Sequence, residues 1–94
     1  MMAVRIIVPM QALPGKGDDY ARARMPRHAE VRNDPGCEQF DLFRNVENPD
    51  QFLLVERWTD EASLEAHYAL KRPPIGADLR APEGGGKQER YIVD

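Results

Sequence analysis

Two side chains in the second half of the chain, an aromatic indole and a titratable imidazole, have types and a spacing that could support chemistry. Trp58 ends a strand-forming stretch, and His67 follows nine positions later in a helical one. An indole ring packs well against a flat ligand and donates one hydrogen bond through its nitrogen. An imidazole accepts or relays a proton near neutral pH. We therefore predict that Trp58 and His67 are the catalytic residues of one site.

The neighbours of these two residues indicate what else would line such a site. Leu64 and Tyr68 share the predicted helical face with His67, and Phe40 lies on an earlier strand. We predict that these three residues bind the substrate. Each candidate also has a structural alternative, because a tryptophan is often buried for its area, a histidine can cap a helix, and a tyrosine can pack with its hydroxyl in water.

Two further polar side chains have a structural interpretation beside the chemical one. Glu56 has the strand parity of Trp58 and therefore points to the same sheet face. It is either a buried carboxylate with a partner or a member of an ion pair at an interface, and a structural role is favoured. Cys37, predicted on the opposite strand face from Phe40 and Leu42, has no base near it in the sequence. We expect a small buried side chain there and not a nucleophile.

Turn and periodicity signals predict six elements around these residues. Pro35-Gly36 and Asn48-Pro49-Asp50 mark turns, and the segment 72–87 has turn chemistry throughout. Pro26 interrupts a helical stretch, so that helix either kinks near Arg24 or restarts at Pro26. The predicted elements are a strand over 4–8 closed by Pro9, a helix over 16–33, strands over 37–44 and 51–58, a helix over 61–68 capped by Thr59 or Asp60, and a strand over 88–93.

The order strand, helix, strand, strand, helix, strand predicts the ferredoxin-like βαββαβ arrangement of the α+β class. The second and third strands have a short connection, so they form a hairpin in a four-stranded antiparallel sheet. Two helices cover only one sheet face, whereas Phe52 and Leu53 are apolar and point to opposite faces. Because a second copy packed sheet on sheet would cover the other face, we expect a homodimer.

Length and composition exclude several classes of function. The 94 residues suit a single domain over 1–94, and a net charge of −3 with interleaved signs offers no basic stripe for nucleic acid. The arginines at 22, 24, 27 and 32 are diluted by acidic neighbours, which favours a solvated helix face over a phosphate-binding patch.

The single cysteine excludes an internal disulfide and fits a reducing compartment. Without a signal peptide or an apolar run of about 20 residues, the chain is expected in the cytoplasm and not at a membrane.

The sequence carries no motif that indicates a metal or a nucleotide cofactor. Gly84-Gly85-Gly86-Lys87 lacks the ending of a phosphate-binding loop and precedes a short strand, so a flexible turn is expected. The two histidines are not spaced with cysteines or carboxylates as metal ligands are. We expect no cofactor, and redox chemistry would then use the electrons of the substrate.

The stretch from Gly36 to His67 also carries an ordered series of short motifs. They are Gly36-Cys37, Asn48-Pro49-Asp50, Glu56-Arg57-Trp58, Asp60-Glu61 and His67. In this order and spacing the series resembles the antibiotic biosynthesis monooxygenase family. The resemblance implies a dimeric α+β barrel that oxygenates an electron-rich phenol or quinol, a small aromatic substrate, with dioxygen and no cofactor. It also implies a place for Trp58 in the substrate pocket.

Two other functions of the same fold stay open at this point. One is a non-catalytic dimeric barrel that binds a small apolar ligand, because a fold does not determine a function. The other is a haem-binding or haem-degrading relative. Those relatives resemble each other in a ligating histidine further along the second helix and an asparagine in the first strand. Here the residues after His67 are Tyr68 to Pro73 and the first strand has no asparagine, so haem is disfavoured.

Overall fold

The computed structural model describes residues 2–82 and 85–94 and has the predicted α+β element order. The elements are β1 (Ala3–Gln11), α1 (Gly17–Val31), β2 (Cys37–Arg44), β3 (Gln51–Trp58), α2 (Glu61–Ala69), a short 3-10 helix η1 (Ala77–Leu79) and β4 (Glu89–Val93). The ferredoxin-like βαββαβ prediction is therefore confirmed. The helix η1 lies in the connection for which only turns were predicted.

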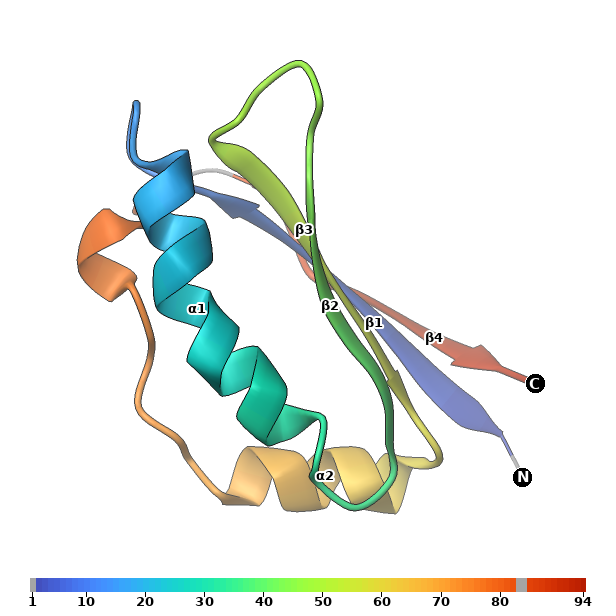
Figure 1. Ribbon diagram of the computed structural model, residues 1–94. Helices are drawn as coiled ribbons and strands as arrows, with labels where there is room; N and C mark the ends of the chain where they lie inside the picture. Colours follow the sequence, from blue (N-terminus) through green and yellow to red (C-terminus); the bar gives the residue numbers. More distant parts are fainter. Residues whose placement is uncertain (1, 83–84) are drawn as a thin grey trace.

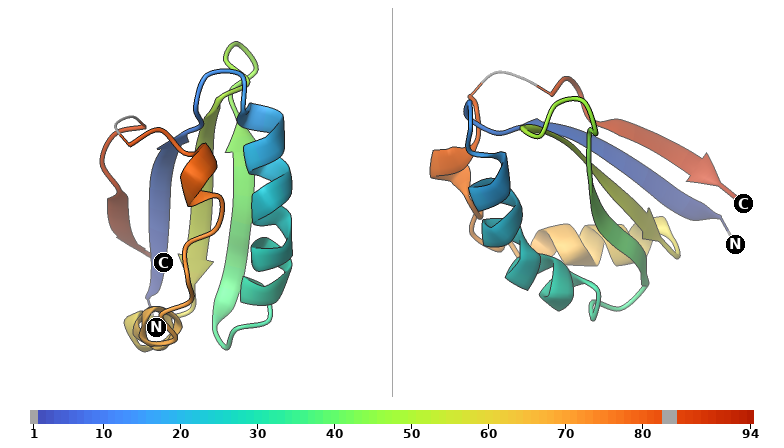
Figure 2. Two further views of the ribbon diagram at one scale, coloured as in Figure 1. Left: turned by 90° about the vertical axis from the view of Figure 1, so that its left-hand side faces the viewer. Right: turned by 45° about the horizontal axis from the view of Figure 1, so that its top comes forward.

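The four strands form one antiparallel sheet in the order β2-β3-β1-β4 (Figure 1). β2 and β3 make the predicted hairpin, while β1 lies between β3 and β4 and joins the two halves of the chain. Both helices lie on the same side of the sheet (Figure 2). Among the described residues, no helix or strand covers the other side, which leaves one sheet face open in the single chain.

The core lies between the sheet and the two helices, and period-two alternation selects its strand members. Leu54 and Trp58 of β3 face the helices and are buried, whereas Leu53 faces the open side and is 43% exposed. The buried apolar cluster contains Val4, Ile6, Met10, Ala12, Tyr20, Val31, Phe40, Phe52, Leu54, Trp58 and Leu64. The predicted apolar character of both sheet faces is confirmed by this pattern.

The first strand is longer than predicted, because it continues through Pro9, which pairs with Leu53. Proline cannot donate to a sheet ladder and normally stays at sheet edges. The Ala12 amide donates to the Asp50 carbonyl, on the β3 side of β1. Backbone amides along a strand point alternately to the two neighbouring strands, so the Pro9 nitrogen, three residues earlier, points to the β4 side. β4 pairs with β1 only as far as Ile7. Pro9 therefore lies at a local edge, where no ladder hydrogen bond is lost.

The predicted strand face of Cys37 is wrong, because β2 contains a bulge. The register with β3 shifts between Cys37 and Gln39, so Cys37 lies opposite Trp58 and Gln39 lies opposite Arg57. An extra residue in one strand reverses the alternation of side chains beyond it. Cys37 consequently packs against the buried cluster, on the same side as Phe40.

The two helices differ in how well their limits follow from the sequence. α1 is one helix with Pro26 inside it, so a helix that restarts at Pro26 is wrong. Pro26 is exposed, and water can bond to the carbonyl that loses its helical partner. α2 begins as predicted, since the Asp60 carboxylate accepts a hydrogen bond from the Ser63 amide at 2.8 Å.

The connection from α2 to β4 folds back along the helical side of the molecule (Figure 2). An isolated bridge joins Arg80 to Ala12, and the Ala81 amide donates to the Gln11 carbonyl at 2.8 Å. Gly84 of the predicted glycine turn lies outside the described residues. Among the described residues, no helix is long and apolar enough to cross a bilayer.

Candidate functional site

A cavity of about 310 Å³ lies on the helical side of the sheet. β2 and β3 contribute its floor through Phe40, Leu54 and Glu56, while α1 and α2 contribute two sides. The segment 71–80 closes a further side, and it is the same connection that folds back in Figure 2. The segment predicted to consist of turns therefore forms part of the cavity wall.

Glu56 is the acidic residue of this cavity and is only 4% exposed. Strand parity places it on the helical side, two residues before Trp58, whose indole nitrogen donates to Glu56 Oε1 at 3.0 Å. Burial raises the pKa of the Glu56 carboxyl, and the indole hydrogen bond opposes that rise. Glu56 is thus a buried, partnered carboxylate, the first of the two predicted alternatives. Its raised pKa suits it to accept a proton in the cavity.

His67 lines the same cavity, and polar and ring contacts hold its imidazole. Its Nδ1 lies 2.9 Å from Asp34 Oδ2, and its ring lies 4.6 Å from the Trp58 ring at an angle of 30°. Hydrogen bonds from Arg72 are the main cause that lowers the pKa of Asp34, so this carboxylate is ionised and can only accept. Arg72 Nη1 also lies 3.3 Å from Nδ1, but the shorter contact is to Asp34, which can only accept, and it favours a proton on Nδ1. Nε2 is then the ring nitrogen that can face a ligand.

Arg72 ties the start of the connection to the first half of the chain. Its guanidinium donates two hydrogen bonds to Asp34, at 2.6 and 2.7 Å, and also reaches Glu30 at the end of α1. Asp34 raises the pKa of Arg72 further above its ordinary range. Forked guanidinium contacts of this kind fix direction as well as charge. Arg72 thereby fixes the wall of the cavity and the carboxylate that orients His67.

The structure brings the predicted site residues together but gives them different positions. Phe40, His67 and Tyr68 line the cavity, and Tyr68 keeps 47% of its surface exposed. Trp58 and Leu64 are fully buried and are not lining residues. The indole N–H of Trp58 is already bonded to Glu56, so Trp58 contacts the cavity through Glu56 and His67. The catalytic and binding roles of these residues stay predictions.

Two of the four arginines expected on a solvated helix face line the cavity instead. Arg22 and Arg32 are exposed and pair with Asp19 and Asp41, as that interpretation requires. Arg24 and Arg27 are half-buried and line the cavity. The expectation is wrong for this second pair, because helical periodicity turns positions 24, 27 and 31 toward the sheet.

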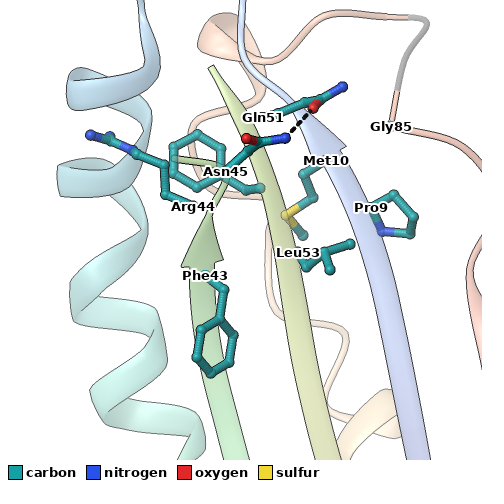
Figure 3. Close-up of a pocket in the computed structure, with 9 residues that line it drawn as sticks. Pro9, Met10, Phe43, Arg44, Asn45, Gln51, Leu53 and Gly85 are labelled. Carbon is teal, nitrogen blue, oxygen red and sulfur yellow. Dashed lines mark hydrogen bonds between the residues drawn. The ribbon is translucent and has the colours of Figure 1, made fainter. Parts of the chain in front are cut away.

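A second cavity, of about 380 Å³, opens mainly on the uncovered side of the sheet (Figure 3). Pro9, Phe43 and Leu53 contribute apolar surface to it, and Asn45 donates to the Gln51 side chain at 3.0 Å at its rim. Among the residues that the structure describes, its lining includes no carboxylate and no histidine. The cavity around Glu56 and His67 is the one for which the structure describes acid–base groups.

Comparisons with known proteins agree with the resemblance seen in the sequence. The sequence model of the family described as antibiotic biosynthesis monooxygenase matches residues 3–71. A Bacillus subtilis (strain 168) protein, "Putative monooxygenase YcnE", is 30% identical over 54 residues. That match covers 57% of this chain and 57% of the other, so it spans less than two thirds of the relative.

Solved structures show the same fold at low sequence identity. A conserved protein from Methanosarcina mazei Go1 has a TM-score of 0.77 and 21% identity, with 100% of this chain and 95% of that chain covered. A "Putative antibiotic biosynthesis monooxygenase" from Nitrosomonas europaea has a TM-score of 0.74 and 22% identity, with 98% and 88% covered. At these identities the two structures support the fold alone.

Proposed function

The chain belongs to the antibiotic biosynthesis monooxygenase family, and on that premise we propose that it oxygenates a small aromatic phenol or quinol with dioxygen and without a cofactor. One observation carries the proposal. The cavity that the helices form over the sheet holds a buried carboxylate, Glu56, beside a histidine, His67, whose Nε2 has no hydrogen-bond partner within the described part of the chain. Removing the phenolic proton is the step for which such groups are needed.

The proposed reaction uses only electrons of the substrate. A base removes the hydroxyl proton of a phenol, and the aryloxide passes one electron to dioxygen. Recombination forms a C–O bond at the para carbon; that carbon then loses its hydrogen as a proton, and the O–O bond breaks. One oxygen atom stays on the ring as a quinone carbonyl, and the other leaves as water with both hydrogens. A quinol with a free ring carbon gives a hydroxyquinone by the same balance.

The residues of the cavity divide this work between them. Glu56 and His67 are the groups that take the two protons, and the apolar floor formed by Phe40 and Leu54 excludes water from the reactive anion. Trp58 is a positioning residue, because its N–H holds Glu56 and its ring packs against His67. Tyr68 lies at the rim, and burial raises the pKa of its hydroxyl, which keeps it neutral at physiological pH.

We expect the purified protein, treated with a chelator, to consume dioxygen when supplied with 1-naphthol, anthrone or 1,4-naphthoquinol. One dioxygen should disappear for each quinone formed, and added catalase should return none, because the second oxygen atom ends in water. An oxygen electrode with product analysis measures both ratios. Binding of these compounds without dioxygen uptake would instead favour the non-catalytic barrel. Catalase-sensitive uptake would indicate simple quinol oxidation to hydrogen peroxide.

We also propose that the protein acts as a homodimer that packs sheet on sheet. The open sheet face carries apolar side chains with large exposed fractions, 51% for Phe43, 43% for Leu53 and 48% for Tyr91. Apolar surface gathered on one face of a sheet is typical of an association site. A two-fold axis would cover it with one self-complementary surface.

The dimer predicts a clear result in sedimentation equilibrium at micromolar concentration, namely twice the chain mass of 10.7 kDa. Leu53→Glu should convert it to a monomer, because a charge would be buried at the centre of the interface. Leu70→Glu is the matched control, since Leu70 is 56% exposed at the end of α2, away from the open face. A wild-type protein that sediments at the monomer mass would contradict the proposal.

A further inference from the structure

The charge of the catalytic cavity is opposite to that of the whole protein. The chain has a net charge of −3, yet among the described residues five cationic side chains line the cavity against one carboxylate, Glu56. The five are Arg24, Arg27, Lys71, Arg72 and Arg80. Two come from α1 and three from the connection after α2, so they reach the cavity from different elements. A local reversal of charge inside a cavity raises the concentration of anions there.

Contacts within the protein neutralise only part of this charge. Arg72 is bound to Asp34 and Glu30, and Arg27 lies 4.0 Å from the same Glu30. Arg24 donates its Nε hydrogen to a neutral partner, the His28 ring, at 3.1 Å. His28 is fully buried, and that burial, with Arg24 second, lowers its pKa to about 4, so it brings no positive or negative charge at neutral pH.

Lys71 and Arg80 complete the cationic lining from the connection. Within residues 2–82 and 85–94, neither side chain makes a hydrogen bond or an ion pair, and both are exposed at the mouth of the cavity. Lys71 also has a backbone φ of 48°, in the left-handed region where glycine is easier to accommodate. It directly follows the C-cap residue Leu70 of α2, where glycine is the usual residue. A lysine at such a position suggests a use for its ammonium group.

From this lining we infer that the substrate is an aromatic hydroxy acid, whose carboxylate is bound by cationic side chains of the cavity while its phenol faces Glu56 and His67. The inference takes the phenolic ring from the proposed function and adds the acidic group. Guanidinium groups bind carboxylates through short, charge-assisted hydrogen bonds. An acidic group on the substrate would bring an anion to a lining in which cationic side chains outnumber the described carboxylate, Glu56. Those cations would also stabilise the phenolate once it forms.

Binding can be measured without turnover, by calorimetry under nitrogen at pH 6.5 and low salt. The probes are 6-hydroxy-2-naphthoate and 6-hydroxy-2-naphthamide, which share ring and phenol and differ in the charge of the substituent. We expect the carboxylate to bind at least about tenfold more tightly than the amide. Raising the salt concentration should reduce this ratio, because exposed charges are screened. Equal affinities, or no binding of either probe, would overturn the inference.

Variants test which cations recognise the carboxylate. Arg24→Gln and Arg80→Gln should each reduce the acid-to-amide ratio by about threefold or more, while Arg22→Gln should leave it unchanged, because Arg22 is exposed and paired with Asp19. Lys71→Gly separates recognition from folding: glycine relieves the left-handed backbone, so stability should not fall, yet carboxylate affinity should. A ratio unchanged by all three cavity variants would also overturn the inference.

The outcome for the carboxylate is independent of the outcome for catalysis. Dioxygen uptake with neutral phenols and equal binding of acid and amide would retain the proposed function and remove the acidic group. Selective carboxylate binding with no dioxygen uptake from 1,4-dihydroxy-2-naphthoate would retain the anion site and remove the oxygenase function.

Discussion

Glu56→Gln is expected to lower turnover by about 10²- to 10⁴-fold, the usual contribution of a general base, while the protein stays folded. Glutamine has nearly the shape of glutamate, and its carbonyl oxygen can still accept the hydrogen bond from Trp58. What the variant loses is the capacity of a buried group with raised pKa to take a proton. The measurement is dioxygen uptake at matched folded fraction, with substrate binding measured separately.

The same variant should change how stability depends on pH, and the sign follows from the raised pKa of Glu56. Between its unfolded and folded pKa values, the folded protein holds the proton and the unfolded chain has lost it. Stability therefore falls as pH rises through that window, which begins near the ordinary glutamate value of 4.5. In Glu56→Gln, the decrease in the free energy of unfolding that comes from ionisation of Glu56 should be absent. Thermal unfolding between pH 4 and pH 8 tests this prediction.

Trp58→Phe is the companion variant, because it keeps a ring beside His67 and removes the donor to Glu56. The indole hydrogen bond lowers the pKa of Glu56, so its loss should raise that pKa further. If ionised Glu56 is the base, activity should rise with pH, and in this variant the rise should occur at a higher pH than in the wild type. His67 should remain stacked. If Glu56→Gln retained full activity, Glu56 would be structural, and His67 would become the leading candidate for the base.

Gly17→Ala is expected to destabilise the protein by roughly 3 kcal/mol, the upper end of the usual cost of overpacking. Helix propensity alone predicts the opposite sign, since alanine in a helix is about 0.5–1 kcal/mol better than glycine. However, a Cβ at position 17 would lie 2.0 Å from the Pro49 carbonyl oxygen and 2.9 Å from Asp50 Oδ1. The Gly17 amide also donates to that carboxylate at 2.9 Å. The start of α1 would have to move away from the β2–β3 connection.

Gly15→Ala provides the matched comparison two residues earlier. Gly15 has a φ of 77°, but nothing lies within 4 Å of a Cβ added there. Only the left-handed conformation is unfavourable, at about 1–2 kcal/mol for an L-residue. Urea unfolding of both variants measures their free energies of unfolding, and Gly17→Ala should be the less stable of the two. A Gly17→Ala protein that is more stable than wild type would show that α1 can shift freely, and Arg24 and Arg27 would then be loosely held as well.

Local signals account for most of what the sequence predicted about the fold. The turn at Asn48-Pro49-Asp50, the Asp60 cap and the apolar alternation of β3 each act over a few residues, and the structure confirms the elements that they predict. The end of the first strand was placed too early, at Pro9. The neighbouring strand β4 comes from the far end of the chain, and its pairing with β1 extends only to Ile7, so the sequence around Pro9 does not show that it lies at a local edge. A one-residue bulge in β2, which reverses the face of Cys37, has no clear signal in a single sequence.

The candidate site was harder to predict because its contacts join distant residues. Arg72 and Asp34 are 38 positions apart, and nothing in the local sequence of either one indicates the other. Strand parity correctly placed Glu56 on the same sheet face as Trp58. Parity alone could not show whether that face lines a cavity within the chain or an interface with a second copy. Arg24 and Arg27 have helical spacing with Val31, an apolar residue that is buried. This spacing could have predicted that both arginines face the sheet, but the acidic residues near them in the sequence favoured a solvated face.

The last strand has a consequence for how the protein opens. Within the described residues, β4 pairs only with β1, through Ala3 to Ile7, and four of its five residues are exposed in the single chain. Its amides should therefore exchange with deuterium through a small opening that leaves the β1–β3 pair closed, at a free energy below that of global unfolding. Such an opening would expose the edge of β1 to proteases and to other strands. Deuterium exchange at the β4 amides should therefore increase before the elements around the cavity unfold, and it would report the first step of unfolding.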